Sequence, residues 1–137
     1  MKFMKLETKF WKKLKSLTPE IHWTRIESLS SPGVPDLHGL FFTPWDYSIS
    51  FWAELKCSPM KKVRLTPKQI SWNSSYYKGG GNNFILVEDL PNRGLYIYPG
   101  SAVKELSIKG LDHPPLAVLP YPWDTTLLRI HLHHRRT

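Results

Sequence analysis

The sequence is poor in cysteine, in long apolar runs and in acidic side chains. Cys57 is the one cysteine among 137 residues, which excludes an internal disulfide framework and a zinc site built on several cysteines. A reducing, cytoplasmic setting is therefore expected. No apolar run approaches the roughly 20 residues that span a bilayer, and the first residues lack the apolar core of a signal peptide. We expect neither membrane association nor secretion.

Internal repeats and low-complexity segments are also missing, so a single domain is the simplest organisation. A chain of this length can bury a core of its own. Hydrophobic residues make up 41% of the sequence and aromatic residues 13%, which excludes an intrinsically disordered protein.

Positive charge is in excess. Lysine and arginine number 19 against 11 aspartate and glutamate residues, which gives a formal net charge of +8. A small domain with this balance most often binds a polyanion, usually nucleic acid. A basic protein without such a partner is the alternative. An RNA-binding protein is a third possibility, although no RNA-binding motif is present.

The first seventeen residues are expected to form a helix, because apolar residues recur at steps of three and four. This stripe consists of Phe3, Leu6, Phe10, Leu14 and Leu17. Glu7 is the one charged residue inside the apolar sector, once Met4 and Trp11 are included. A charge that points inward needs a partner, and a neighbouring lysine is one candidate.

The rest of the chain predicts an α/β fold with a mixed central sheet. Thr66 can cap a helix that begins with Pro67 and ends near Lys78, before three glycines. A strand, this helix and a second strand imply a right-handed crossover between parallel neighbours. Strands are expected at 36–42, 48–57, 84–88 and 95–98, and residues 21–26 form either a short strand or an extended connection. A weak helix is expected at 101–106. The proline-rich stretch 112–124 is expected to lie extended on the surface.

Three residues of the predicted hairpin 36–57 form a chemical constellation. Glu54 and Lys56 share one face of their strand, with Cα atoms about 6.5–7 Å apart, and an antiparallel partner strand brings Asp36 beside Glu54. Two adjacent carboxylates repel each other unless a cation lies between them. Magnesium accepts such ligands together with water and phosphate oxygens. It can activate a water molecule and polarise a phosphodiester, while Lys56 stabilises developing negative charge.

Three sequence motifs together resemble the PD-(D/E)XK nucleases. They are Gly33-Val34-Pro35-Asp36, Glu54-Leu55-Lys56 and Leu65-Thr66-Pro67-Lys68-Gln69. With the helix glutamate upstream, the pattern is similar to small phage nucleases related to the VRR-NUC and Holliday-junction-resolvase branches. The resemblance covers about residues 4–90. It implies a restriction-endonuclease-like fold with a nuclease domain at 1–110. Residues 111–137 are then a Pro-rich segment and a basic C-terminal strand or tail of the same domain.

The resemblance also implies roles for individual residues. Asp36, Glu54 and the Leu55 carbonyl would bind Mg²⁺, for which Mn²⁺ can substitute, and Lys56 would be the catalytic lysine. Glu7 matches a helix glutamate that completes the acidic cluster, and Glu27 is a second candidate ranked below it. Gln69 matches a glutamine that lines the site, although a capping-box role alone would also explain it.

The implied activity is that of a magnesium-dependent DNA endonuclease that leaves 5′-phosphate and 3′-hydroxyl ends. The expected activity is cleavage of branched DNA such as a Holliday junction, or general nicking. A homodimer is expected, which acts in the cytoplasm of the host cell if a phage encodes the protein. Phosphate contacts are expected from the basic residues Lys61, Lys62, Arg64 and Lys68. The alternative is a non-catalytic nucleic-acid-binding accessory protein on the same fold.

The sequence also gives expectations for the tryptophans, the C-terminal histidines and the cysteine. Most of the six tryptophans are expected in the core, whereas Trp45 in the hairpin turn is a candidate for stacking on bases. The histidines of the last residues, His131, His133 and His134, are interpreted as part of a basic arm and not as a metal site. Cys57 is expected to be a small packed residue.

Overall fold

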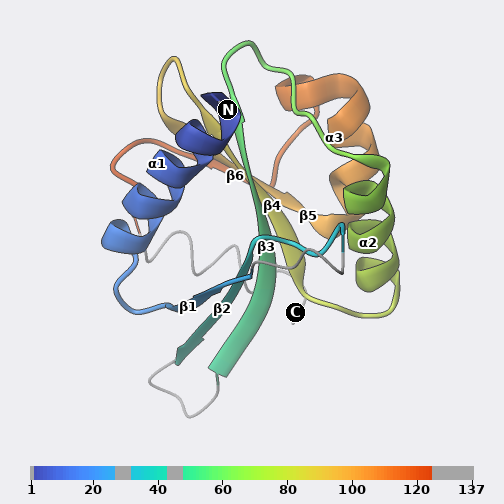
Figure 1. The fold of residues 1–137 in the computed structure, drawn as a ribbon, viewed down its shortest axis with the longest axis horizontal. Coiled ribbons are helices and arrows are strands. Elements are labelled where there is room, and N and C mark those ends of the chain that lie inside the picture. Colours follow the sequence, from blue (N-terminus) through green and yellow to red (C-terminus); the bar gives the residue numbers. More distant parts are fainter. Residues whose placement is uncertain (1, 27–31, 43–47, 125–137) are drawn as a thin grey trace.

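The computed structural model describes residues 2–26, 32–42 and 48–124 (Figure 1). The helices are α1 (Lys2–Leu17), α2 (Pro67–Lys78) and α3 (Val103–Lys109), with short 3₁₀ turns η1 (Gly100–Ala102) and η2 (Gly110–Asp112). The strands are β1 (His22–Arg25), β2 (Leu37–Phe42), β3 (Ser48–Ser58), β4 (Asn83–Asp89), β5 (Gly94–Pro99) and β6 (Ala117–Leu119). These elements confirm the predicted helices and strands to within a few residues.

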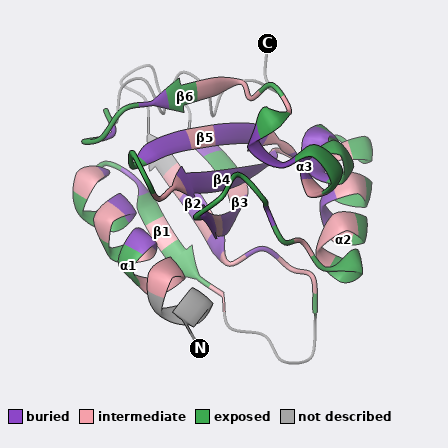
Figure 2. Cartoon of the chain, turned by 90° about the horizontal axis from the view of Figure 1, so that it is seen from above, coloured by how far each residue is buried: buried purple, intermediate pink, exposed green. Residues whose placement is uncertain are grey.

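The six strands form one mixed sheet in the order β1-β2-β3-β4-β5-β6. β3 and β4 pair in parallel, and the other neighbours pair antiparallel. The parallel pair is joined through α2, as the strand–helix–strand pattern predicts. α1 covers one face of the sheet, whereas α2 and α3 cover the other (Figures 1 and 2). The predicted α/β fold with a mixed sheet is therefore confirmed.

Each face of the sheet has its own hydrophobic core. On the α1 side, Phe10 and Leu14 pack against Phe51 and Leu55. On the α2–α3 side, the core is formed by residues such as Val87, Tyr98 and Leu106 of β4, β5 and α3. Because strand side chains alternate, β3 places its odd-numbered apolar residues toward α1 and leaves Trp52, Glu54 and Lys56 on the other face.

α2 begins with the local chemistry that the sequence predicts. The Thr66 side chain accepts a hydrogen bond from the Gln69 backbone N–H, and the Gln69 side chain accepts one from the Thr66 N–H. Pro67 occupies the first turn, where its missing N–H costs nothing. This capping box fixes the position of Gln69 at the start of the helix.

The Pro-rich segment is more than a surface covering. It forms β6 on the edge of β5, and Trp123 is 2% exposed, in an edge-on contact with Phe10 at 5.4 Å between ring centroids. The Trp123 Nε1–H donates to the Arg93 carbonyl at 2.8 Å. Extension is observed as expected, and the burial of Trp123 agrees with the expectation that most tryptophans lie in the core.

Several expectations fall outside the described residues: those on Glu27, Trp45, and the histidines His131, His133 and His134. None of the helices that the structure describes is long and apolar enough to cross a membrane.

Candidate functional site

The carboxylates of Asp36 and Glu54 lie side by side where β2 begins. β2 pairs with β3 so that Leu37 is opposite Ala53, which places Asp36 opposite Glu54, as the sequence predicts. The Asp36 Oδ2 atom accepts a hydrogen bond from the Leu55 backbone N–H at 3.0 Å. Asp36 is thereby fixed by the strand that carries Glu54.

The Leu55 backbone faces the open end of β2. β2 pairs with β3 only from Ser48 to Ala53, so beyond Ala53 this edge of β3 is available to side chains. The N–H and carbonyl of one strand residue point to the same side of the strand. Because the Leu55 N–H points at Asp36, its carbonyl also faces the edge on which Asp36 lies. This geometry is compatible with the ligand role expected for the Leu55 carbonyl.

Glu54 is a buried carboxyl group, 1% exposed. Burial raises its pKa to about 10, with further contributions from the Asp36 charge and a side-chain hydrogen bond to Asp36, while Lys56 acts in the opposite direction. The Glu54 Oε2 atom accepts a hydrogen bond from the Gln69 side chain at 3.3 Å. The other oxygen, Oε1, is buried without a hydrogen-bond partner in the described part of the chain.

Glu7 reaches this site from the first helix. Its side chain is partly buried, and burial raises its pKa, with opposing effects from Lys56 and Arg25 and a further increase from Asp36. The three charged groups that act on Glu7 all come from outside α1. The structure therefore places Glu7 beside Asp36 and Lys56, in agreement with its inward direction on the helix.

The donor set fits a magnesium ion. In the described ranges, no group of three or more histidine, cysteine, aspartate or glutamate side chains is close enough to form a metal cage. Magnesium does not require such a cage, because it keeps several waters and is usually held by one or two carboxylates and by phosphate oxygens. Asp36 and Glu54 supply those carboxylates, and the unpartnered Glu54 Oε1 is a buried acceptor that a cation would satisfy.

Gln69 serves the helix cap and the site at once. Its side-chain oxygen accepts from the Thr66 N–H at 3.0 Å, and its side-chain nitrogen donates to Glu54. The two interpretations of this residue are therefore compatible. The cap holds the amide in the orientation in which its nitrogen faces the buried carboxyl group.

Substitutions on either side of the capping box should separate the two roles of Gln69. Gln69→Ala and Thr66→Ala each break the box and are expected to lower the free energy of unfolding by about 1 kcal/mol. Only Gln69→Ala also removes the donor to Glu54, so its cleavage rate should fall by about 10-fold or more. Thermal unfolding and plasmid cleavage of both variants test this prediction. Equal losses of cleavage in the two variants would reduce Gln69 to a cap residue.

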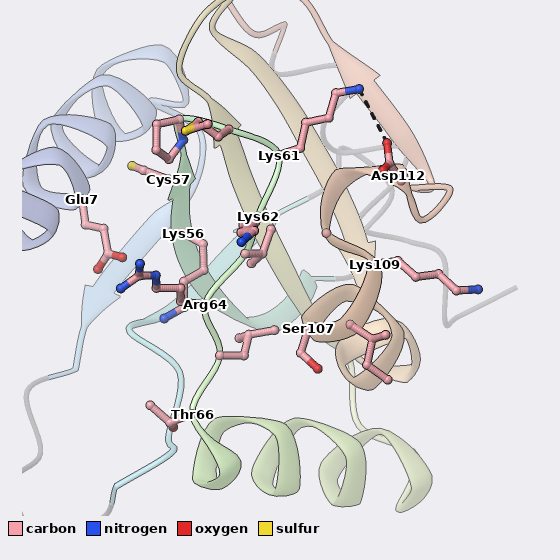
Figure 3. Close-up of a pocket in the computed structure, with 16 residues that line it drawn as sticks. Glu7, Lys56, Cys57, Lys61, Lys62, Arg64, Thr66, Ser107, Lys109 and Asp112 are labelled. Atoms are coloured by element: carbon pink, nitrogen blue, oxygen red, sulfur yellow. Dashed lines mark ion pairs between the residues drawn. The ribbon is translucent and has the colours of Figure 1, made fainter.

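A basic cleft borders the site on the side of Glu7 and Lys56 (Figure 3). It has a volume of about 1150 Å³, and Glu7 and Lys56 lie in its wall. Its cationic side chains are Lys56, Lys61, Lys62, Arg64 and Lys109. Figure 3 shows the Glu7, Lys56 and Arg64 side chains converging on one side of the cleft. The exposed Lys61 also lies 3.6 Å from Asp112, a pair weakened by solvent.

The cleft includes three of the four basic residues predicted to bind phosphate. Lys61, Lys62 and Arg64 line it, whereas Lys68 is exposed on α2 outside its lining. The Lys68 backbone instead supports the Asp36 loop: Gly33 has φ +95°, and a Cβ atom there would lie 2.5 Å from the Lys68 carbonyl oxygen. Only glycine can combine this left-handed conformation with so close an approach.

Two cationic residues of the site had no role in the sequence analysis. Arg25 lines a small cavity together with Glu7, Asp36 and Leu55, and Lys109 comes from α3. The register of β1 and β2 places Arg25 opposite Leu37, next to Asp36, and predicted hairpin pairing could have indicated this. The contribution of α3 depends on tertiary packing.

Cys57 and His38 lie near the site. Cys57 is buried, and burial raises the pKa of its thiol to about 12, so it stays a neutral packed group, as predicted. His38 lies two residues after Asp36 on the same strand face. Burial lowers its pKa, and the charge of His22 adds to this effect.

No protein-family model matches this chain, and a search of the curated proteins finds no match either.

Proposed function

We propose that this protein is a magnesium-dependent DNA endonuclease with a PD-(D/E)XK fold. The observation that carries the proposal is that Glu7, Asp36, Glu54 and Lys56 act on one another's charge, and that Glu7 and Lys56 also line a basic cleft. These residues come from α1, from the start of β2 and from β3. A mixed sheet flanked by helices is also the architecture that this nuclease fold implies.

The proposed chemistry follows from what each residue can do. Asp36, Glu54 and the Leu55 carbonyl would hold the ion, and Glu7 would complete the acidic group. A bound magnesium ion polarises the phosphodiester and lowers the pKa of a bound water. The Lys56 ammonium, on the same strand face as Glu54, stabilises negative charge that develops on the phosphate. Gln69 keeps the Glu54 carboxyl in place through its hydrogen bond.

We further propose that the enzyme cuts branched DNA or nicks double-stranded DNA and that two copies act together in the cytoplasm. A homodimer would place one site on each of two strands. The basic cleft supports a polyanionic substrate, because Glu7 and Asp112 are its acidic side chains against five cationic ones.

Cleavage and binding should be measured on the same DNA. A labelled four-way junction and a matched linear duplex would be incubated with Mg²⁺, Mn²⁺ or EDTA. Metal-dependent, symmetric cuts in the junction are expected for a resolvase-type enzyme. Equal cutting of both substrates would support the nuclease activity and contradict a preference for junctions. Binding without cutting under every metal condition would favour the non-catalytic accessory protein.

The basic cleft predicts a specific salt dependence. Lys62→Ala should weaken DNA binding to a similar extent for all sequences and reduce the slope of log affinity against log salt by about 1. Lys104, an exposed lysine of α3 that does not line the cleft, is the matched control. Binding isotherms at several salt concentrations test this. If Lys104→Ala changes the slope equally, the positive charge of Lys62 contributes to DNA binding independently of its position in the cleft.

A further inference from the structure

A row of four aromatic side chains leads away from the carboxylate site. His38 contacts Trp52 at 5.1 Å between ring centroids, Trp52 contacts Trp72 at 5.7 Å, and Trp72 stacks on Tyr76 at 4.6 Å. We define these four residues as the aromatic row. It bridges β2, β3 and α2, so it crosses from the sheet to the helix.

Three members of the row are direct neighbours of site residues. His38 follows Asp36 by two residues on β2, and Trp52 precedes Glu54 by two on β3, so each pair shares a strand face. Trp72 lies three residues after Gln69 on α2, which is one helical turn. The row therefore begins beside the carboxylates, and Tyr76 forms its far end.

The row is not part of the hydrophobic core. Among the described residues, Trp52 and Trp72 belong to neither buried cluster nor to the side chains packed against them. Both tryptophans and His38 are half-buried, and Tyr76 is 38% exposed. The neighbouring strand residues Thr24 and Ser50 are exposed, so the sheet face beside the row is open. Trp52 and Trp72 are therefore exceptions to the expectation that most tryptophans lie in the core.

The far end of the row is held in place before any ligand binds. The Tyr76 ring lies over Gly81, where a Cβ atom would come within 2.1 Å of the ring, and its plane is within 13° of the Trp72 ring. Partly exposed aromatic surface next to a cationic groove is the usual combination in proteins that bind single strands. Bases inside a duplex hide their faces from such rings, whereas unpaired bases present them.

We propose that the aromatic row stacks the unpaired bases of a DNA strand whose phosphate lies at the carboxylate site. The inference rests on the proposed nuclease function and narrows its substrate to DNA with unpaired nucleotides next to the cut, as at a flap, a branch point or a frayed end. The basic cleft then receives the phosphates and the row receives the bases.

The test measures binding in EDTA, so it does not depend on cleavage. A labelled strand of thymidines and a strand of equal length with abasic sites in place of the bases carry the same phosphates. The wild-type protein should bind the thymidine strand at least about fivefold more tightly, since stacking contributes about 1–3 kcal/mol per base. Tyr76→Leu should remove most of this preference and leave the affinity for the abasic strand unchanged.

Two further variants complete the test. Tyr76→Phe keeps the ring and should keep the preference. Tyr121→Leu removes an aromatic residue of matched exposure, 39% against 38%, that contacts Trp123 on the α1 side, and it should also keep the preference. Equal affinity of the wild type for both strands, or equal weakening of both by Tyr76→Leu, would overturn the proposal. Nicking of plasmid in Mg²⁺ tests the nuclease separately, so either proposal can fail alone.

Discussion

Replacing Glu54 with glutamine is expected to abolish magnesium-dependent cleavage and to stabilise the metal-free protein at the same time. Cleavage should fall by at least about 10²-fold, because the variant loses a ligand charge beside Asp36. Stability should rise because the Glu54 carboxyl ionises in the unfolded chain but must stay protonated in the folded protein, where its pKa is raised to about 10. The amide has the same shape, and its oxygen can still accept the hydrogen bond from Gln69.

The pH dependence of this effect has a definite sign. The unfolded chain releases the Glu54 proton near pH 4.5, whereas the folded metal-free protein holds it to about pH 10. The stability that this proton provides is complete below pH 4.5 and is lost as the pH rises toward 10. The melting temperature of Glu54→Gln should therefore exceed that of the wild type by a margin that grows from pH 6 to pH 9. Each kcal/mol corresponds to about 3–5 °C in a chain of this size.

Thermal unfolding in EDTA and in Mg²⁺ measures both parts of the Glu54 prediction. The wild type should gain stability when magnesium binds, because the ion binds the folded state, and the variant should gain little. Lys56→Ala is expected to keep this gain and serves as the comparison. A variant that is less stable than the wild type at pH 9 would contradict the buried, protonated carboxyl group.

Lys56→Ala should produce the second large effect, a loss of cleavage by about 10²–10³-fold with metal binding retained. Its ammonium group lies on the strand face of Glu54 and lowers the pKa of both Glu54 and Glu7. Without it, both carboxyl groups hold their protons more strongly, so the remaining activity should also shift to higher pH. Rates of plasmid nicking across a pH series at saturating DNA measure this.

Lys109→Ala is the matched control for Lys56→Ala. Lys109 also lines the cleft, but it is exposed on α3 and does not act on the pKa of either glutamate. This substitution should weaken DNA binding without changing the rate at which the bound protein cleaves DNA, or the pH dependence of that rate. If Lys56→Ala behaves in the same way, Lys56 binds phosphate and does not assist the reaction.

Local patterns were sufficient to predict most of the elements and the centre of the site. Alternation along β3 assigned Glu54 and Lys56 to one face, and the hairpin length placed Asp36 beside Glu54. The capping box defined the start of α2 and thus the position of Gln69. Each of these inferences depends on residues close in sequence, where the geometry of a strand or a helix turn leaves few alternatives.

Features that depend on distant packing could not be predicted in this way. The contact of Trp123 with Phe10 joins opposite ends of the chain, and the position of Lys109 in the cleft depends on how α3 packs. The half-exposure of Trp52 and Trp72 depends on how far α2 covers the sheet. Large aromatic residues are usually buried, so composition alone favoured the core for both.

The rate of supercoiled plasmid nicking in Mg²⁺, compared between the wild type and Glu54→Gln at equal DNA occupancy, tests the central claim most directly. The wild type should nick the plasmid and stop when EDTA is added, while the variant binds the same DNA and leaves it intact. Nicking by the variant at the wild-type rate, or binding by the wild type without nicking in either Mg²⁺ or Mn²⁺, would contradict a catalytic metal site at Asp36 and Glu54.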